Sequence, residues 1–290
     1  MTAATLAQVL QPALAGRCAV AGLVTLGWED MRAFVAAAEA ERLPVILQIG
    51  PGCRAHTPLP ILARMLRHLA EAASVPVVTH LDHGTTLAEC RIAIEEGLTS
   101  VMYDGSRKAL RQNIDETAAI AEWAHRAGVS CEGEIGFVGY AGGAPSAGTD
   151  PVEAECFARE TNVDAMAISV GNLHLQQHSG GGLDLPRIRA IEALTPVPLV
   201  IHGGSGVPLA ERARLARITN ICKFNIGTEL RMAFGRALRQ GLADDPGRFD
   251  RVEILSATEA PLTAATRPIL RALAAAEVSA SDRSPGQAPD

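Results

Sequence analysis

The segment PLVIHGGSGVPLAERARLARITNICKFNI, residues 198–226, contains a complete strand–helix–strand unit. A short aliphatic run over 198–201 is followed by a glycine-rich turn, a helical stretch over 208–218 and a second aliphatic run over 221–226. Runs this apolar are typical of strands that are buried on both faces, as in a parallel sheet. The segment therefore predicts two neighbouring parallel strands joined by a helix.

The same alternation extends toward both ends of the chain. Earlier aliphatic runs occupy 18–25, 44–49, 76–81, 99–103, 129–135 and 165–170. Stretches with helical spacing lie over 28–41, 59–73, 86–96, 113–127, 151–160, 186–194 and 229–242. Eight such units predict an α/β fold, a (β/α)8 TIM barrel. A doubly wound sheet is the alternative, but no GxGxxG turn follows the first run, which also argues against a nucleotide cofactor.

The chain length fits this interpretation. A length of 290 residues suggests about two average domains, but a barrel commonly uses about 250 residues as one domain. We expect a single barrel domain over 1–276, which includes an additional C-terminal helix over 257–276. The remaining residues, 277–290, are polar and rich in Pro, Gly and Ser, which predicts a disordered tail.

Composition excludes several classes of function. The net charge of −6 and an aromatic content of 3% argue against a nucleic-acid-binding protein. No apolar run reaches the roughly 18 to 20 residues that span a membrane. The six cysteines form no CxxC pair and no signal peptide is recognisable, so we expect a reduced, cytoplasmic protein.

Polar residues gather where the predicted strands end, which is where barrels carry their active sites. Asp82 and His83 follow the third run, Glu134 ends the fifth, and His174 and His202 follow the sixth and seventh. Three imidazoles with a nearby carboxylate suit Zn²⁺ or another divalent metal and leave a position open for substrate. The alternative is that these histidines are structural.

The glycine-rich turn HGGSG, residues 202–206, indicates a different kind of site. Glycines there leave backbone N–H groups free to bind an anion, and Ser205 adds a hydroxyl. Gly227 and Thr228, after the eighth run, would complete a phosphate site, because the loops after strands seven and eight are the usual phosphate site of barrels. A plain strand–helix turn is the alternative.

Several blocks together resemble the class II, metal-dependent ketose-bisphosphate aldolases, the fructose- and tagatose-bisphosphate group. The resemblance is clearest over about 75–234, and its blocks are THLDHG (79–84), TSVMYDGS (99–106), CEGEIG (131–136), TDPVEA (149–154), NVDAMAISVGNLH (162–174), PLVIHGGSGVP (198–208) and KFNIGTELRMAF (223–234).

The resemblance implies reversible C–C cleavage of a phosphorylated ketose through a metal-stabilised enediolate with a dihydroxyacetone-phosphate-like half. It implies that His83, His174 and His202 bind the metal, that Asp82 moves the proton on the C4 oxygen, and that Glu134 approaches this metal or a second one. It implies contacts to the dihydroxyacetone-phosphate half from Gly203, Ser205, Asn225, Gly227 and Thr228. It also implies a monovalent cation and a homodimer or higher homo-oligomer.

This chain departs from the family pattern in its loops. The loop after the fifth run, FVGYAGGAPSAG (137–148), lacks the usual acidic residue, so Glu132, Asp150 or a water would have to move the proton at the enolising carbon. Leu175 stands where the family has a Gly that contacts phosphate or the monovalent cation. The stretch after it lacks the usual Lys, whose charge His178 could replace in part, although a plain loop histidine is the simpler interpretation.

Changes near the first two runs affect the outer end of the substrate. The family's QxS pattern is replaced by QIGPG (48–52), and the usual Asn-bearing first strand end by GLVTLGWED (22–30). Arg54, Arg107 and Lys108 could bind an anion there, although we expect solvated charges. Two alternatives therefore stay open: a diverged aldolase whose substrate is not a bisphosphate, and a non-catalytic sugar-phosphate-binding protein.

Overall fold

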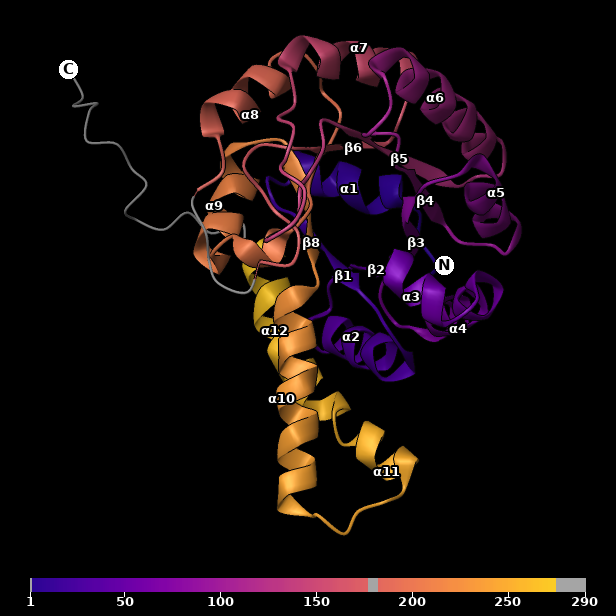
Figure 1. Cartoon of the computed structure of the whole chain (residues 1–290), viewed down its shortest axis with the longest axis vertical. Helices are drawn as coiled ribbons and strands as arrows, with labels where there is room; N and C mark the ends of the chain where they lie inside the picture. Colours follow the sequence, from indigo (N-terminus) through magenta and orange to yellow (C-terminus); the bar gives the residue numbers. More distant parts are fainter. Residues whose placement is uncertain (1, 177–181, 275–290) are drawn as a thin grey trace, which may run out of the picture.

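The computed structural model describes residues 2–176 and 182–274, and its strands form a closed barrel in sequence order, all parallel (Figure 1). The strands are β1 (Val20–Val24), β2 (Val45–Ile49), β3 (Val77–Gly84), β4 (Ser100–Tyr103), β5 (Ser130–Ile135), β6 (Ala165–Ile168), β7 (Leu199–Ile201) and β8 (Ile221–Ile226). Every strand falls in one of the predicted aliphatic runs, and β3 continues beyond its run to Gly84. The predicted barrel is confirmed.

Helices surround the strands (Figure 1). They are α1 (Leu6–Ala15), α2 (Trp28–Glu41), α3 (Pro51–His56), α4 (Leu59–Ala72), α5 (Leu87–Glu95), α6 (Leu110–Arg126), α7 (Pro151–Thr161), α8 (Leu185–Glu192), α9 (Leu209–Ile218), α10 (Thr228–Asp244), α11 (Arg251–Ser256) and α12 (Glu259–Ala274). The additional C-terminal helix is confirmed as α12. The sequence did not predict α1, α3 or α11, and the expected tail over 277–290 lies outside the described residues.

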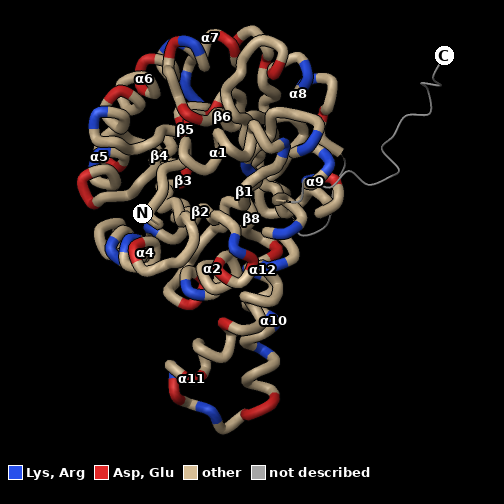
Figure 2. Tube along the Cα trace, turned by 180° about the vertical axis from the view of Figure 1, so that it is seen from behind, with Lys and Arg blue, Asp and Glu red and all other residues tan. Residues whose placement is uncertain are grey.

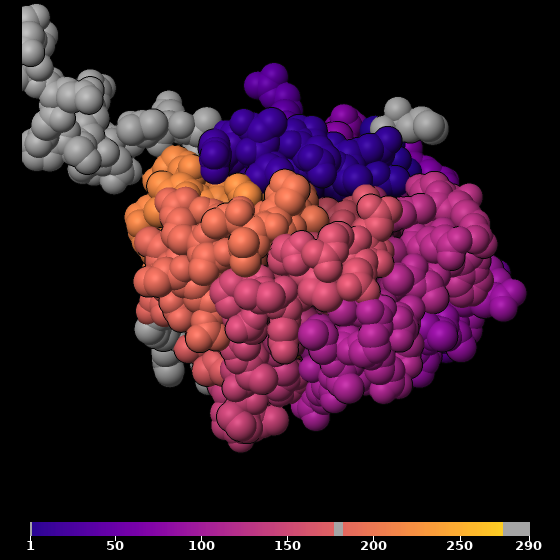
Figure 3. Space-filling view, turned by 90° about the horizontal axis from the view of Figure 1, so that it is seen from above, coloured from indigo at the N-terminus to yellow at the C-terminus, as the bar shows by residue number. Residues whose placement is uncertain are grey.

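Helix α1 covers the amino end of the barrel. Its start is fixed by a capping box in which Thr5 and Gln8 each bond the other's backbone N–H. On its apolar face, Leu6 and Leu10 belong to the same buried cluster as Ile46 and Val78, which lie near the amino ends of β2 and β3. The indigo N-terminal segment spreads over this face of the molecule (Figure 3). Access to the barrel centre is therefore left to the opposite, carboxyl end.

The last helix packs against elements from the beginning and the end of the barrel sequence. Helix α12 packs against α2 and α10, and the N–H of Ala19 before β1 donates to the carbonyl of Leu273. Helix α10 extends away from the barrel, and α11 lies near its far end (Figure 1). In the 180° view, charged residues lie mainly on the outer helices and on this extension (Figure 2). None of the described helices is long and apolar enough to cross a membrane.

Candidate active site

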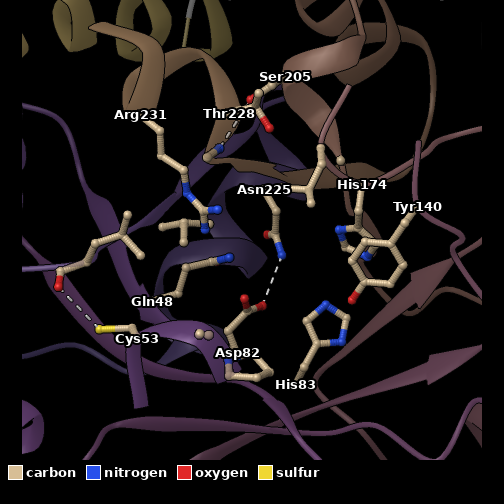
Figure 4. A pocket seen from close by; sticks show the side chains of 18 residues that line it. Gln48, Cys53, Asp82, His83, Tyr140, His174, Ser205, Asn225, Thr228 and Arg231 are labelled. Carbon is tan, nitrogen blue, oxygen red and sulfur yellow. Dashed lines mark hydrogen bonds between the residues drawn. The ribbon is translucent and has the colours of Figure 1, made fainter. Parts of the chain in front are cut away.

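Three histidines from three strand ends meet at the carboxyl end of the barrel. The ring of His83 lies 4.6 Å from that of His202 and 5.2 Å from that of His174, measured between centroids. One nitrogen from each ring falls within 4.8 Å of the other two. Figure 4 shows His83 and His174 on the wall of a cavity that also contains Asp82. The structure thus brings together the three residues that the sequence singled out as metal ligands.

The free atoms of this cluster fit a divalent cation. His83 Nε2, His202 Nδ1 and Glu134 Oε2 are buried, and none has a hydrogen-bond partner among the described residues. Glu134 Oε2 lies 3.3 Å from His202 Nδ1 and 3.6 Å from His83 Nδ1. Buried polar atoms without a partner are costly, and imidazole with carboxylate is a donor set that divalent metals prefer. The residues therefore fit a bound metal ion.

Each of two histidines is oriented by an acid on its other nitrogen. His83 Nδ1 lies 2.7 Å from Asp104 Oδ2, and His202 Nε2 lies 3.1 Å from Glu132 Oε1. Such contacts fix the tautomer and the ring direction of a metal-binding histidine. Asp104 was not predicted, although it directly follows β4 and the strand-end rule points to it. Together with His83 and Glu134 it forms a second group that could hold a metal ion.

The protonation of the cluster follows from its burial and its charges. Burial and the neighbouring imidazoles lower the pKa of His174 to about 3, so this ring is neutral and free to bind a metal. Burial opposes protonation of His202 as well, but its hydrogen bond to Glu132 and the nearby negative charge of Glu134 raise the pKa to about 10. In the metal-free protein, the proton on His202 therefore balances the negative charges of Glu132 and Glu134. A bound metal cation would take over that role.

Asp82 lies at the base of the cavity beside the histidines. Its Oδ1 accepts a hydrogen bond of 3.3 Å from Asn225 Nδ2, the dashed contact in Figure 4. Burial alone would raise the pKa of Asp82, but the positive charges of His83 and His202 hold it below its usual range. Asp82 is therefore ionised at rest and able to accept a proton.

The predicted phosphate site lines the same cavity. Gly203, Ser205, Asn225, Gly227 and Thr228 all contribute to its wall. The Ser205 hydroxyl oxygen accepts the N–H groups of Gly227 and Glu229 at 3.2 and 3.4 Å, which leaves its proton free to be donated. Gly203 has a φ of +63°, and a Cβ there would lie 2.0 Å from the carbonyl oxygen of Leu173. Only glycine fits this turn.

Residues 137–148 place an aromatic side chain at the cavity instead of an acid. The loop pairs with itself between Phe137 and Ala147, and Tyr140 pairs with His174. The Tyr140 ring stacks on the His174 ring with centroids 4.9 Å apart. Neither Glu132 nor Asp150, proposed above as substitutes for the acid, lines the cavity. Glu132 is buried against Lys223, and Asp150 caps α7.

The three basic residues proposed as solvated charges or anion binders have other contacts. The Arg54 side chain is 6% exposed and bonds the carbonyls of Asp82 and His83 as well as the Glu89 carboxylate. Arg107 stacks over Phe137, and Lys108 pairs with Glu116. Arg54 therefore holds the backbone of β3 in place, so the expectation of a solvated charge there is wrong. His178 lies outside the described residues.

The sequence missed several residues of the cavity wall. Gln48 is buried, and its amide has no hydrogen-bond partner within the described chain. Cys53, Tyr140 and Arg231 also line the cavity (Figure 4). Arg231 follows Thr228 by one helical turn, a spacing that would have placed it near the phosphate site. Leu175 lies on the same wall with a φ of +57°, a conformation that favours glycine.

A closed barrel with a histidine cluster that fits a divalent ion at its carboxyl end is the architecture of a metal-dependent barrel enzyme. The family model for class II fructose-bisphosphate aldolase matches residues 4–277, and the chain belongs to this family of aldehyde-lyases. The family that the sequence resembles is therefore confirmed.

Named relatives support this assignment. The chain is 35% identical over 262 residues to a fructose-bisphosphate aldolase of Geobacillus stearothermophilus, which covers 88% of this chain and 91% of the relative. It is 39% identical over 180 residues to a 6-phospho-5-dehydro-2-deoxy-D-gluconate aldolase of Shouchella clausii, covering 61% of each. The crystal structure of the YdjI aldolase from Escherichia coli K12 superposes with a TM-score of 0.83 at 26% identity, covering 94% of this chain and 97% of that one.

Proposed function

We propose that the protein is a metal-dependent aldolase that reversibly cleaves a phosphorylated ketose and releases a dihydroxyacetone-phosphate-like half. The observation that carries this proposal is the shared cavity, because one space is lined by His83 and His174, by Asp82 and by the phosphate-site residues Ser205 and Thr228. Membership of the aldolase family supports the reaction class.

In this proposal His83, His174 and His202 hold the metal, with Glu134 close by. Asp104 and Glu132 hold the His83 and His202 rings in orientation through the hydrogen bonds described above. A bound Zn²⁺ or similar divalent ion would supply Lewis acidity toward the substrate's carbonyl oxygen. The exposed wall beside Leu175 is where the family pattern suggests a monovalent cation.

Asp82 is the proposed general base for cleavage. Its ionised carboxylate takes the proton of the C4 hydroxyl while that oxygen becomes a carbonyl and the C3–C4 bond breaks. The electron pair of this bond stays with the three-carbon half, which then gains a proton at C3. Tyr140 is the titratable side chain that residues 137–148 place at the cavity, and water is the other available proton source.

The experiment is a cleavage assay on metal-loaded and chelated protein. Activity should be lost on chelation and return with Zn²⁺ or Co²⁺. Asp82→Asn should lower the cleavage rate by about two orders of magnitude or more, as expected for a lost general base. Asp115→Asn, on the exposed surface of α6, is the matched control. Full activity in a verified metal-free sample would contradict the proposal. Binding of a sugar phosphate without any catalysis would also contradict it and would favour a non-catalytic sugar-phosphate-binding protein.

A substrate that is not a bisphosphate is the second candidate. Leu26, Gly50 and Pro51 line the cavity near β1 and β2 and offer no charged group to a second phosphate. The relative from Shouchella clausii is named for a substrate with a carboxylate and one phosphate. A panel of fructose and tagatose 1,6-bisphosphates, ketose 1-phosphates and 6-phospho-5-dehydro-2-deoxy-D-gluconate separates the two candidates. Fast cleavage of a bisphosphate alone would reject the second.

We also propose a cytoplasmic homo-oligomer. All six cysteines are free thiols, as suits a reducing compartment. Phe249 and Val252, near the end of the α10–α11 extension, are 92% and 73% exposed, and exposed apolar side chains of this size suit burial against a second copy. Sedimentation velocity should show a dimer or larger species, and Phe249→Glu should weaken it. A monomer at all concentrations would contradict the proposal.

A further inference from the structure

We infer that Arg231 binds the phosphate of the three-carbon half of the substrate, an inference that rests on the proposed function. Arg231 lies in the first turns of α10 and lines the cavity. Among the described residues that line this cavity, it is the only Lys or Arg. A phosphate that enters the cavity therefore meets one full positive charge from a side chain besides the metal cluster.

Within this cavity, the Arg231 side chain lies beside the predicted phosphate site. Arg231 Nε lies 3.9 Å from the place where a Cβ on Gly227 would be, so the side chain runs beside one of the phosphate-site residues. Figure 4 shows it extending from α10 between Thr228 and Gln48 into the cavity. A guanidinium at this place can bind a phosphate through two charged hydrogen bonds. These would supplement the contacts that the Ser205 hydroxyl and the N-terminus of α10 offer to the same phosphate.

Arg231 is free to make this contact. Its side chain forms no hydrogen bond or ion pair within residues 2–176 and 182–274, unlike Arg54 and Arg212. Asp30 is close enough to interact with its charge, but within the described residues no ion pair or hydrogen bond joins the two side chains, and Asp30 Oδ2 accepts the N–H of Leu26 at 2.8 Å. A cation that lines a cavity without a partner is available to an anionic ligand.

The neighbouring acid does not compete for this phosphate. Glu229 lies two residues before Arg231 on α10, and its carboxylate forms an ion pair of 2.8 Å with Arg212, whose side chain is 3% exposed. The negative charge next to Ser205 is therefore balanced by Arg212, while Arg231 keeps its own charge for the substrate.

The test measures exchange of the α-proton of dihydroxyacetone phosphate into heavy water by the metal-loaded protein, because this reaction involves the three-carbon half alone. Arg231→Met should lower kcat/KM about 10- to 100-fold, as expected for one charged hydrogen-bonding contact. With unphosphorylated dihydroxyacetone the same variant should match the wild type. Arg231→Lys should recover part of the loss, and Arg239→Met, on the exposed part of α10, should have no effect.

Two results would overturn the inference. In the first, Arg231→Met exchanges dihydroxyacetone phosphate as well as the wild type does but cleaves a full ketose phosphate poorly, so that the guanidinium serves the other half. In the second, phosphorylated and unphosphorylated substrates lose activity equally. If the wild type itself shows neither exchange nor cleavage, the proposed function fails. The inference is then decided by calorimetry with inorganic phosphate, where equal affinity of wild type and Arg231→Met rejects it.

Discussion

Lys223 Nζ lies 2.6 Å from Glu132 Oε2 inside the barrel, and both side chains are completely buried. The two residues come from β8 and β5, so the ion pair spans the interior. Burial alone would raise the pKa of Glu132, but the charge of Lys223 holds that pKa well below its usual range. The other oxygen of Glu132 contacts His202, so this ion pair is linked directly to the histidine cluster.

Removal of Lys223 should destabilise the fold. In Lys223→Met the buried Glu132 carboxylate loses the Lys223 charge and keeps only its contact with His202, and breaking a buried pair in this way typically costs about 3–5 kcal/mol. Urea unfolding of the metal-free protein measures this cost. Lys108→Met is the matched control, since Lys108 pairs with Glu116 in a partly exposed position and should change stability by about 1 kcal/mol or less. Equal effects of the two substitutions would contradict the prediction.

Glu132→Gln should weaken metal binding. Glu132 directs His202 Nε2 away from the cluster and leaves Nδ1 free to face it. Loss of such an orienting carboxylate typically reduces metal affinity by about 10- to 100-fold. Competition with a Zn²⁺ indicator measures the change on folded protein, as checked by circular dichroism. Glu153→Gln, on the exposed side of α7, is the control, and an unchanged affinity in Glu132→Gln would show that the carboxylate has no orienting role.

The strands were predictable because each is buried on both faces and therefore reads as a short aliphatic run. Helix α1 was not predicted, because its segment is short and contains Pro12, although Thr5 and Gln8 already carry the capping-box pattern. What fixes α1 is its packing under the barrel against residues such as Ile46, which are far away in sequence. No local pattern contains that contact.

The metal cluster was predictable for the same reason as the fold, since strand ends converge in a closed barrel. The contacts of individual charges were not. Arg54 was expected to be a solvated charge, but in the structure its guanidinium donates to the carbonyls of Asp82 and His83. The spacing of Arg231 from Thr228 points toward the phosphate site, but only the structure shows that the Arg231 side chain lines the cavity. Side-chain direction depends on the packed structure, which spacing alone does not give.

Gly203→Ala should disturb both the fold and the histidine cluster. A Cβ at this position would meet the carbonyl oxygen of Leu173 at 2.0 Å, next to His174, so the backbone must move. We expect a loss of stability clearly greater than the roughly 1 kcal/mol that a positive φ alone costs, together with weaker Zn²⁺ binding. Gly128→Ala separates the two costs, because Gly128 has a φ of +72° and nothing within 4 Å of an added Cβ. Similar losses for both variants would show that the turn tolerates a side chain.

Leu175→Gly should give a more stable protein than Leu175→Ala. Both substitutions remove a side chain that is 49% exposed, but only glycine relieves the φ of +57°. A non-glycine residue in this conformation costs about 1 kcal/mol or more, which exceeds the usual entropic disadvantage of glycine. Leu194 is also a half-exposed leucine, and it is absent from the described residues with positive φ, so there the order should reverse and alanine should be the more stable. Urea unfolding of the four variants decides the matter: the same order at both positions would show that the backbone at Leu175 is not strained.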